Sequence, residues 1–138
     1  MGNKSNICIT DYDLERLREL LRAAKRSGTQ KEALIKLGKE LERAIVISSG
    51  NVPADLITMN SKVRIKDLDT NEEMMFQVVF PSEANLDECK ISILAPVGTA
   101  LIGYKIGDTV RWQVPAGIRK LRIEEILYQP EAAGDIYL

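Results

Sequence analysis

Hydrophobic residues in the first third of the chain recur with the period of an α-helix. Steps of three, four and three residues separate Leu14, Leu17, Leu21 and Ala24. The same steps separate Leu34, Leu37, Leu41 and Ala44. This spacing aligns the apolar side chains along one face of each helix. A turn at residues 27–28 divides the two apolar seams, so the pattern predicts a short antiparallel helical hairpin, a small coiled coil.

Capping residues mark where these helices should begin. Thr10 with Asp13, and Thr29 with Glu32, have the spacing of a capping box. The second helix is expected to end near residues 48–51, because small residues stop the pattern there and Pro53 bars its continuation. With about fifteen residues in each arm, the hairpin reaches ~20–25 Å at ~1.5 Å per residue. We therefore predict a boundary between residues 1–50, the hairpin, and a second domain over residues 51–138.

Beyond residue 51 the hydrophobic positions alternate, which is the pattern of β-strands. Five short strands are predicted around residues 63–65, 74–80, 91–93, 110–114 and 121–128. The alternation slips before Ile126, which indicates a β-bulge. Turns are predicted at residues 67–71, 81–85 and 115–117, with one short helical turn within residues 96–103. The expected fold class is α+β: the helical hairpin, then an antiparallel β domain with one short helix and an extended tail.

Charge and composition narrow the chemistry. The net charge of −1 lacks the basic excess that is usual for nucleic-acid-binding domains. The chain contains no histidine, the commonest general base and metal ligand. Cys8 and Cys89 form no CxxC motif and are expected to stay reduced and buried. No apolar run approaches the ~20 residues of a membrane span, and the start lacks the apolar core of a signal peptide. We therefore expect a cytoplasmic protein without metal or cofactor.

Several sequence blocks after residue 58 occur in a distinctive order. LDTNEE at residues 68–73 precedes an alternating strand, and ISILAPVGTALIG follows at residues 91–103. GDTV at residues 107–110 and PAG at residues 115–117 complete the series. This order resembles the C-terminal domain of the Gre transcript-cleavage factors over roughly residues 58–128. The resemblance implies an FKBP-like fold that docks on bacterial RNA polymerase beside its secondary channel.

Three further sequence blocks indicate which branch of that family the chain resembles. They are TMNSKV at residues 58–63, APVG at residues 95–98 and YQPEAAGD at residues 128–135. Together they resemble the Rnk type, the regulators of nucleoside diphosphate kinase, over nearly the whole chain. The resemblance implies a transcription elongation regulator with a short hairpin that binds polymerase and competes with Gre factors. No residue pattern in the chain indicates the chemistry of that kinase.

The expected hairpin tip differs from what transcript cleavage requires. In Gre factors, acidic residues at the tip help to hold a second magnesium ion, which prefers carboxylate oxygens. Here residues 25–31 read KRSGTQK, without a carboxylate, and residues 22–43 carry seven basic against three acidic side chains, a net +4. We therefore predict no cleavage activity. Lys25 and Arg26 lie at the end of a helix, where positive charge is favoured by the helix dipole. This explanation does not apply to Lys31, which begins a helix, so a weak contact of Lys31 with nucleic acid or an acidic partner is an alternative.

The resemblance also implies a docking surface in the β domain. The predicted loop Pro81, Ser82, Glu83, Ala84 and Asn85 aligns with the Gre loop that contacts polymerase, and Ser92 and Pro96 flank it. Glu83 is the first residue to test, because an exposed carboxylate can pair with a basic partner. Turn chemistry alone also explains these residue types.

Two enzymatic alternatives remain open at this stage. The FKBP-like fold implies peptidyl-prolyl isomerase activity, but only 5% of the residues are aromatic and such a pocket needs aromatic walls. A genuine cleavage factor would have to use other carboxylates, such as Asp11 and Asp13 at the hairpin base. Asp67, Asp69, Asn71 and Glu72 resemble a cation loop only loosely and favour a hairpin turn. Trp112 lies in an alternating strand and is expected in the core. The protein is expected to be a monomer.

Overall fold

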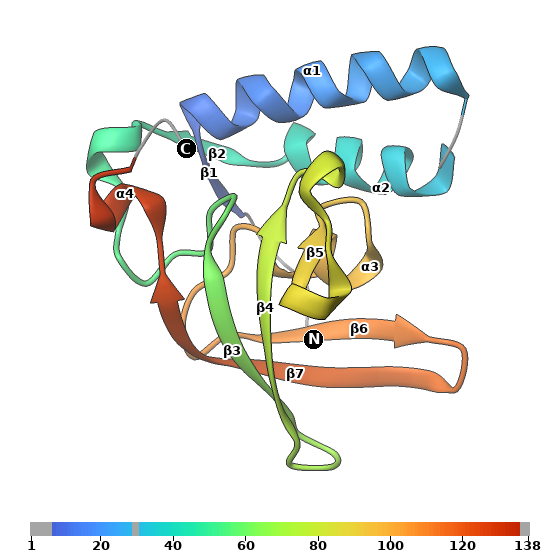
Figure 1. The fold of residues 1–138 in the computed structure, drawn as a ribbon, viewed down its shortest axis with the longest axis vertical. Helices are drawn as coiled ribbons and strands as arrows, with labels where there is room; N and C mark the ends of the chain where they lie inside the picture. The colour runs from blue at the N-terminus through green and yellow to red at the C-terminus, as the bar shows by residue number, and fades with distance from the viewer. Residues whose placement is uncertain (1–6, 29–30, 136–138) are drawn as a thin grey trace.

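The computed structural model describes residues 7–28 and 31–135, and a helical hairpin lies across one end of a curled five-stranded sheet (Figure 1). The first part of the chain comprises β1 (Cys8–Thr10), α1 (Asp11–Ser27), α2 (Lys31–Glu42), β2 (Ile45–Ile47) and the 3₁₀ turn η1 (Ser49–Asn51). The sheet strands are β3 (Lys62–Asp67), β4 (Glu73–Val79), β5 (Lys90–Ser92), β6 (Thr109–Val114) and β7 (Gly117–Tyr128). The short helices are η2 (Pro81–Glu83), η3 (Leu86–Glu88), α3 (Pro96–Leu101) and α4 (Pro130–Ala133).

The predicted hairpin is present, and its first helix begins and ends at the expected residues. The Thr10 hydroxyl accepts a hydrogen bond from the Asp13 amide at 2.9 Å, which is the capping contact predicted for α1. Gly28 ends α1 in the left-handed conformation, with φ of 71°. The second predicted cap, Thr29, lies outside the described residues. The two helices pack side by side, α1 above α2 in Figure 1.

The second helix is shorter than the sequence pattern predicted. It ends at Glu42 and not near residue 48, because residues 45–47 form β2. This strand pairs in parallel with β1, and the Ile45 amide donates to the Ile7 carbonyl at 2.8 Å. The β-branched run Ile45-Val46-Ile47 favours a strand once a partner strand is available. Ala44 therefore follows the helix, although it still packs against the core.

The sheet has the strand order β5-β4-β3-β7-β6. Three of its four pairings are antiparallel, as predicted, but β4 and β5 are parallel, so the expectation of a wholly antiparallel domain was wrong. Apolar residues alternate with a period of two in parallel and in antiparallel strands, so the sequence pattern cannot distinguish the two kinds of pairing. Register shifts between β3 and β7 at Lys62/Val63 and Arg64/Ile65 confirm the predicted bulge. β7 has twelve residues and is not short.

One buried cluster contains apolar residues of both the hairpin and the sheet. Leu17 and Leu37 of the hairpin are fully buried, as is Ile65 of β3. The two leucine seams and the inward faces of the strands were all predicted from their periodicity. Trp112 is partly buried against this core, as predicted. The boundary between residues 50 and 51 stays a prediction, but the hairpin packs on the sheet and does not stand apart from it.

Two expectations about the chain's periphery were wrong. Residues 130–133 form α4 and do not continue as an extended tail, and the buried Gln129 side chain donates to the Pro53 and Leu56 carbonyls at 2.8 and 2.7 Å. Cys89 is exposed, whereas Cys8 is half-buried and both thiols are free. The FKBP-like description stays a prediction. Within residues 7–28 and 31–135, no helix is long and apolar enough to cross a lipid bilayer.

Candidate functional site

Residues 80–89 form the crossover that makes β4 and β5 parallel. Phe80 precedes η2, and Pro81 occupies its first position, where a missing amide proton costs nothing. The Glu83 amide donates to the Phe80 carbonyl at 2.9 Å. The side chains from Ser82 to Cys89 are exposed. The predicted docking loop is therefore a structured surface turn, with Glu83 open to solvent.

The second half of this crossover is fixed by its own hydrogen bonds. Asn85 and Lys90 exchange two backbone hydrogen bonds of 2.9 Å each, and the Asn85 side chain accepts from the Asp87 amide at 3.1 Å. Between them, Leu86 is 84% exposed. The turn holds this leucine in solvent, which the sequence pattern did not predict. Its only signal in the sequence is an apolar residue inside a polar loop.

Ser92 and Pro96 lie where the chain passes from β5 into α3. The Ser92 hydroxyl accepts from the Leu94 amide at 3.0 Å, and Pro96 begins α3 with an exposed ring. A Cβ at Gly98 would lie 2.3 Å from the Ser92 carbonyl oxygen, so only glycine lets α3 approach β5 this closely. Ser92 thus has a structural role in the turn, whereas Pro96 is available to a partner.

A groove of about 760 Å³ lies between the start of α2 and this turn. Lys31 and Lys36 of α2 form one wall, and Ser92 and Pro96 contribute to the other. The fold thereby brings Lys31, predicted at the hairpin tip, together with two residues of the predicted docking surface. Lys25 and Arg26 are exposed at the end of α1 and do not line this groove. Residues 81–83 form η2, which contacts β5, the strand that contributes Ser92 to the groove.

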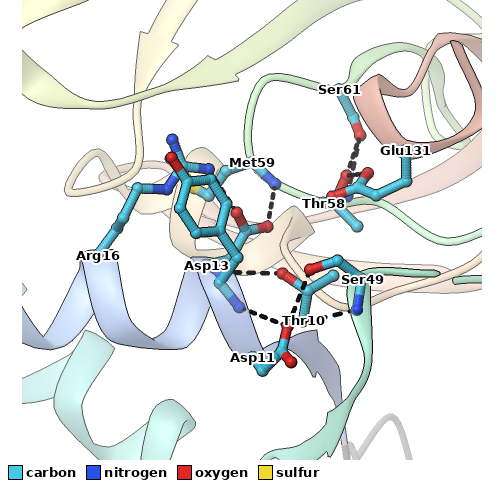
Figure 2. A network of polar contacts seen from close by, with 10 residues as sticks. Thr10, Asp11, Asp13, Arg16, Ser49, Thr58, Met59, Ser61 and Glu131 are labelled. Carbon is cyan, nitrogen blue, oxygen red and sulfur yellow. Dashed lines mark hydrogen bonds and ion pairs between the residues drawn. The ribbon is translucent and has the colours of Figure 1, made fainter. Parts of the chain in front are cut away.

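The base of the hairpin is joined to the β domain by buried polar contacts (Figure 2). The Asp13 carboxylate is 1% exposed; it pairs with Arg16 at 2.6 Å and accepts from the Met59 amide at 3.0 Å. On the surface beside this pair, Asp11 accepts from the Ser49 hydroxyl at 2.8 Å, which joins α1 to η1. The Arg16 guanidinium also lies 4.9 Å from the centre of the Phe80 ring, a cation–π contact. Arg16 therefore links α1 to the residue from which the docking loop begins.

Burial and pairing shift the pKa values of the carboxylates in this network in opposite directions. Desolvation raises the pKa of Asp13, although Arg16 and the Met59 amide oppose the shift. Desolvation also raises the pKa of Glu131, which accepts from the Thr58 hydroxyl at 2.7 Å. Hydrogen bonds from Ser49 lower the pKa of the exposed Asp11. Asp11 and Asp13, the two carboxylates considered for an alternative cleavage mechanism, are thus both engaged in contacts within the fold.

Among the described residues, no group of three or more acidic or cysteine side chains is arranged to hold a metal ion. Asp67, the start of the loose cation-loop pattern, pairs with Arg119 and accepts from the Asp69 amide at 2.8 Å. Arg119 lowers the pKa of Asp67. The segment is therefore a hairpin turn between β3 and β4, as predicted.

Comparison with known proteins assigns both parts of the chain. Residues 52–128 match the family model "Transcription elongation factor, GreA/GreB, C-term", and residues 6–47 match "Rnk N-terminus". The chain is 36% identical over 137 residues to the "Regulator of nucleoside diphosphate kinase" of Escherichia coli strain K12, covering 99% of both chains. It is 40% identical over 93 residues to the "Transcription elongation factor GreA" of Clostridium botulinum strain Eklund 17B, of which it covers 58%.

A solved structure supports the same assignment. The "Prokaryotic transcription elongation factor GreA/GreB from Nitrosomonas europaea" is 38% identical and superposes with a TM-score of 0.74, over 88% of this chain and 99% of that one. The resemblance inferred from the sequence blocks is thereby confirmed for both halves. The chain is a member of the GreA/GreB transcription elongation factor family and, within it, of the Rnk regulators.

Proposed function

We propose that this protein binds bacterial RNA polymerase near its secondary channel and occupies the site that Gre factors use, without stimulating transcript cleavage. The observation that carries the proposal is the docking face: residues 81–85 and Leu86 on a turn fixed by its own hydrogen bonds, beside the groove at Ser92 and Pro96. A preformed surface of this kind binds with little ordering cost. Membership of a family of transcription elongation factors supplies the class of partner.

The dimensions and charge of the hairpin support regulation without cleavage. α1 and α2 have 17 and 12 residues, about 25 Å and 18 Å at ~1.5 Å per residue, and part of that length rests on the sheet. Of the described tip residues, Lys25, Arg26 and Lys31 are basic. Positive charge repels a magnesium ion, which needs oxygen ligands. Occupying the channel entrance is what such a hairpin can do.

The contacts at the hairpin base count against the alternative cleavage mechanism. Asp13 is buried and neutralised by Arg16, and Asp11 binds Ser49 at the same end of α1. Both carboxylates lie a helix length away from the tip. The peptidyl-prolyl isomerase alternative also lacks support, because neither the groove beside α3 nor the groove along the hairpin has an aromatic wall.

A competition assay on core RNA polymerase tests the proposal. The labelled full-length chain should bind the core enzyme at low salt, and an added Gre factor should displace it. Glu83→Lys should weaken binding about tenfold, which corresponds to ~1.4 kcal/mol, because it reverses a charge at the docking face. Absence of binding at low salt, or binding that Gre factors leave untouched, would refute the proposed site.

Glu72→Lys is the matched control. It makes the same charge change on the β3–β4 turn, at the opposite end of β4 from the docking loop (Figure 1). Equal losses for the two variants would mean that only total charge matters. A backtracked polymerase complex assayed in parallel should show no stimulated RNA cleavage. Cleavage that disappears in the Asp11→Asn, Asp13→Asn double variant would instead support the mechanism that uses those residues.

A further inference from the structure

A second groove, of about 680 Å³, runs between the two helices of the hairpin. On the α1 side the groove is lined by Leu21 and Lys25, which share one helix face, and by Gly28, which follows the helix. On the α2 side the groove is lined by Lys31, Leu34, Ile35, Gly38, Lys39 and Glu42. Among the described residues, Lys31 alone lines both this groove and the one beside α3. The hairpin groove is therefore a surface separate from the docking face of the β domain.

The floor of the groove is apolar and partly open to solvent. Ile35 is 54% exposed although it lies in a helix with buried leucines on its other side. Gly38 leaves the groove without a side chain at its middle. A Cβ at this position would meet only the Leu21 Cδ1 atom, at 3.9 Å, which is an ordinary contact. Glycine within a helix costs about 1 kcal/mol relative to alanine, so packing between α1 and α2 does not account for it.

The rim of the groove carries a net positive charge. Lys25, Lys31 and Lys39 border it against a single acidic residue, Glu42, a net charge of +2 over the lining residues. Within the described part of the chain, none of the three lysines takes part in an ion pair. The helix dipole explains cations at the ends of α1 and α2 but not Lys31 at the start of α2. An apolar floor between lysines matches an acidic helix with one apolar face.

We infer that the hairpin groove binds an acidic, amphipathic helical segment of a partner protein. Apolar residues of that segment at positions i, i+3, i+4 and i+7 would cover Ile35 and Gly38, and its carboxylates would pair with the rim lysines. A nucleic acid would satisfy the lysines but leave Ile35 without an apolar partner. This inference goes beyond the proposed docking on polymerase and does not depend on residues 81–85.

Fluorescence anisotropy with a designed peptide tests the inference on the full-length chain. The probe is an amphipathic helix of about fourteen residues, ~21 Å long, with leucines on one face and glutamates beside them. A matched peptide carries lysine in place of every glutamate. The acidic peptide should bind at least about tenfold more tightly than the basic one. Failure of the acidic peptide to bind at low salt would overturn the inference.

Gly38→Leu is the decisive variant, because it fills the groove while improving helix propensity. It should abolish peptide binding and leave the melting temperature unchanged or raised. Lys39→Glu should weaken binding about tenfold. Lys36→Glu is the matched control on the same helix, since Lys36 lines the other groove and should leave peptide binding unchanged. Full binding by Gly38→Leu would overturn the inference.

Two further measurements separate this groove from the alternatives. A single-stranded RNA of equal length and charge should neither bind as tightly as the peptide nor displace it. RNA that displaces the peptide, with affinity insensitive to Gly38→Leu, would identify the lysines as a nucleic-acid surface and overturn the inference. Glu83→Lys should leave peptide affinity unchanged, so that failure of the docking proposal and failure of this one give different results.

Discussion

At the base of the hairpin the Asp13 carboxylate is buried and paired, whereas the charged side chains at the tip are exposed to solvent. Asp13 is 1% exposed and engages Arg16 and the Met59 amide, and Arg16 in turn contacts Phe80. Lys25, Arg26 and Lys31 are exposed at the other end. Removing one partner of a buried pair costs far more than changing a solvated charge. Charge at the base therefore fixes the hairpin on the β domain, and charge at the tip is available to a partner.

The largest expected effect contrasts a leucine near the base with an isoleucine near the tip. Leu17→Ala should lower the free energy of unfolding by ~2–5 kcal/mol, because Leu17 is fully buried and its loss leaves a cavity. Ile35→Ala should change it by less than ~0.5 kcal/mol, because that side chain is half exposed. Urea denaturation followed by circular dichroism measures both. Equal losses would mean that the tip half of the hairpin is as firmly packed as the base.

The next effect concerns the buried carboxylate at the base. Asp13→Ala should cost ~1–3 kcal/mol of unfolding free energy, because the Met59 amide loses its acceptor inside the protein. Asp11→Ala is the control, since it removes an exposed carboxylate from the same helix turn and should cost less. Thermal unfolding of the two variants at pH 7 provides the comparison. A greater loss for Asp11→Ala would refute the role assigned to burial.

A smaller effect should appear as a change in pH dependence. The folded protein raises the pKa of Glu131, so it binds this proton more readily than the unfolded chain does. The contribution of Glu131 to stability is therefore greatest at low pH and is lost as pH rises through the folded pKa. Glu131→Gln removes the cost of the buried charge and should raise the melting temperature at pH 8. The two proteins should converge below about pH 4, where Glu131 is protonated.

Melting curves across this pH range measure the difference. Asp13 also has a raised pKa and remains in both proteins, and its charge raises the pKa of Glu131, so the difference between the two curves includes the repulsion between these carboxylates. A melting temperature of Glu131→Gln that lies below that of the wild type at pH 8 would contradict the sign. Such a result would mean that the contact with Thr58 requires the charged carboxylate.

The smallest effects test the charges at the tip. Lys25→Glu should destabilise the protein by ~0.3–1 kcal/mol, because it puts a negative charge at the carboxyl end of α1. Lys31→Glu should have the opposite sign, because the amino end of α2 favours negative charge. Both effects should shrink in 1 M salt, where charges are screened within ~3 Å. Changes of the same sign in the two variants would refute the dipole explanation.

Much of the hairpin could be predicted because its signals are local. The leucine steps, the Thr10 cap and the Gly28 ending each depend on neighbouring residues only. The end of α2 could not be predicted in the same way. Residues 45–47 continue a helix-compatible pattern, and only pairing with β1, far away in the sequence, makes them a strand. The parallel β4–β5 pair was missed because the alternating pattern carries no direction.

The candidate site was predicted in part. Residues 81–85 lie on the surface as expected, and Lys31, Ser92 and Pro96 meet at one groove. Leu86 was missed, because hydrophobicity alone suggests burial and only the turn around it holds the side chain in solvent. The hairpin groove was also missed. In the sequence, Gly38 indicates only a position that weakens the helix. The groove at this position becomes evident when α1 is seen to lie beside it.

The sequence by itself determined the family, the hairpin, the inward faces of the strands and the basic character of the tip. These follow from periodicity, capping and charge, which are properties of short segments. The tertiary structure alone decided how Asp13, Arg16 and Phe80 join the hairpin to the docking loop, and which surfaces remain open as grooves. The physical reason is that burial and pairing depend on segments distant in sequence, and a side chain's environment exists only after those segments meet.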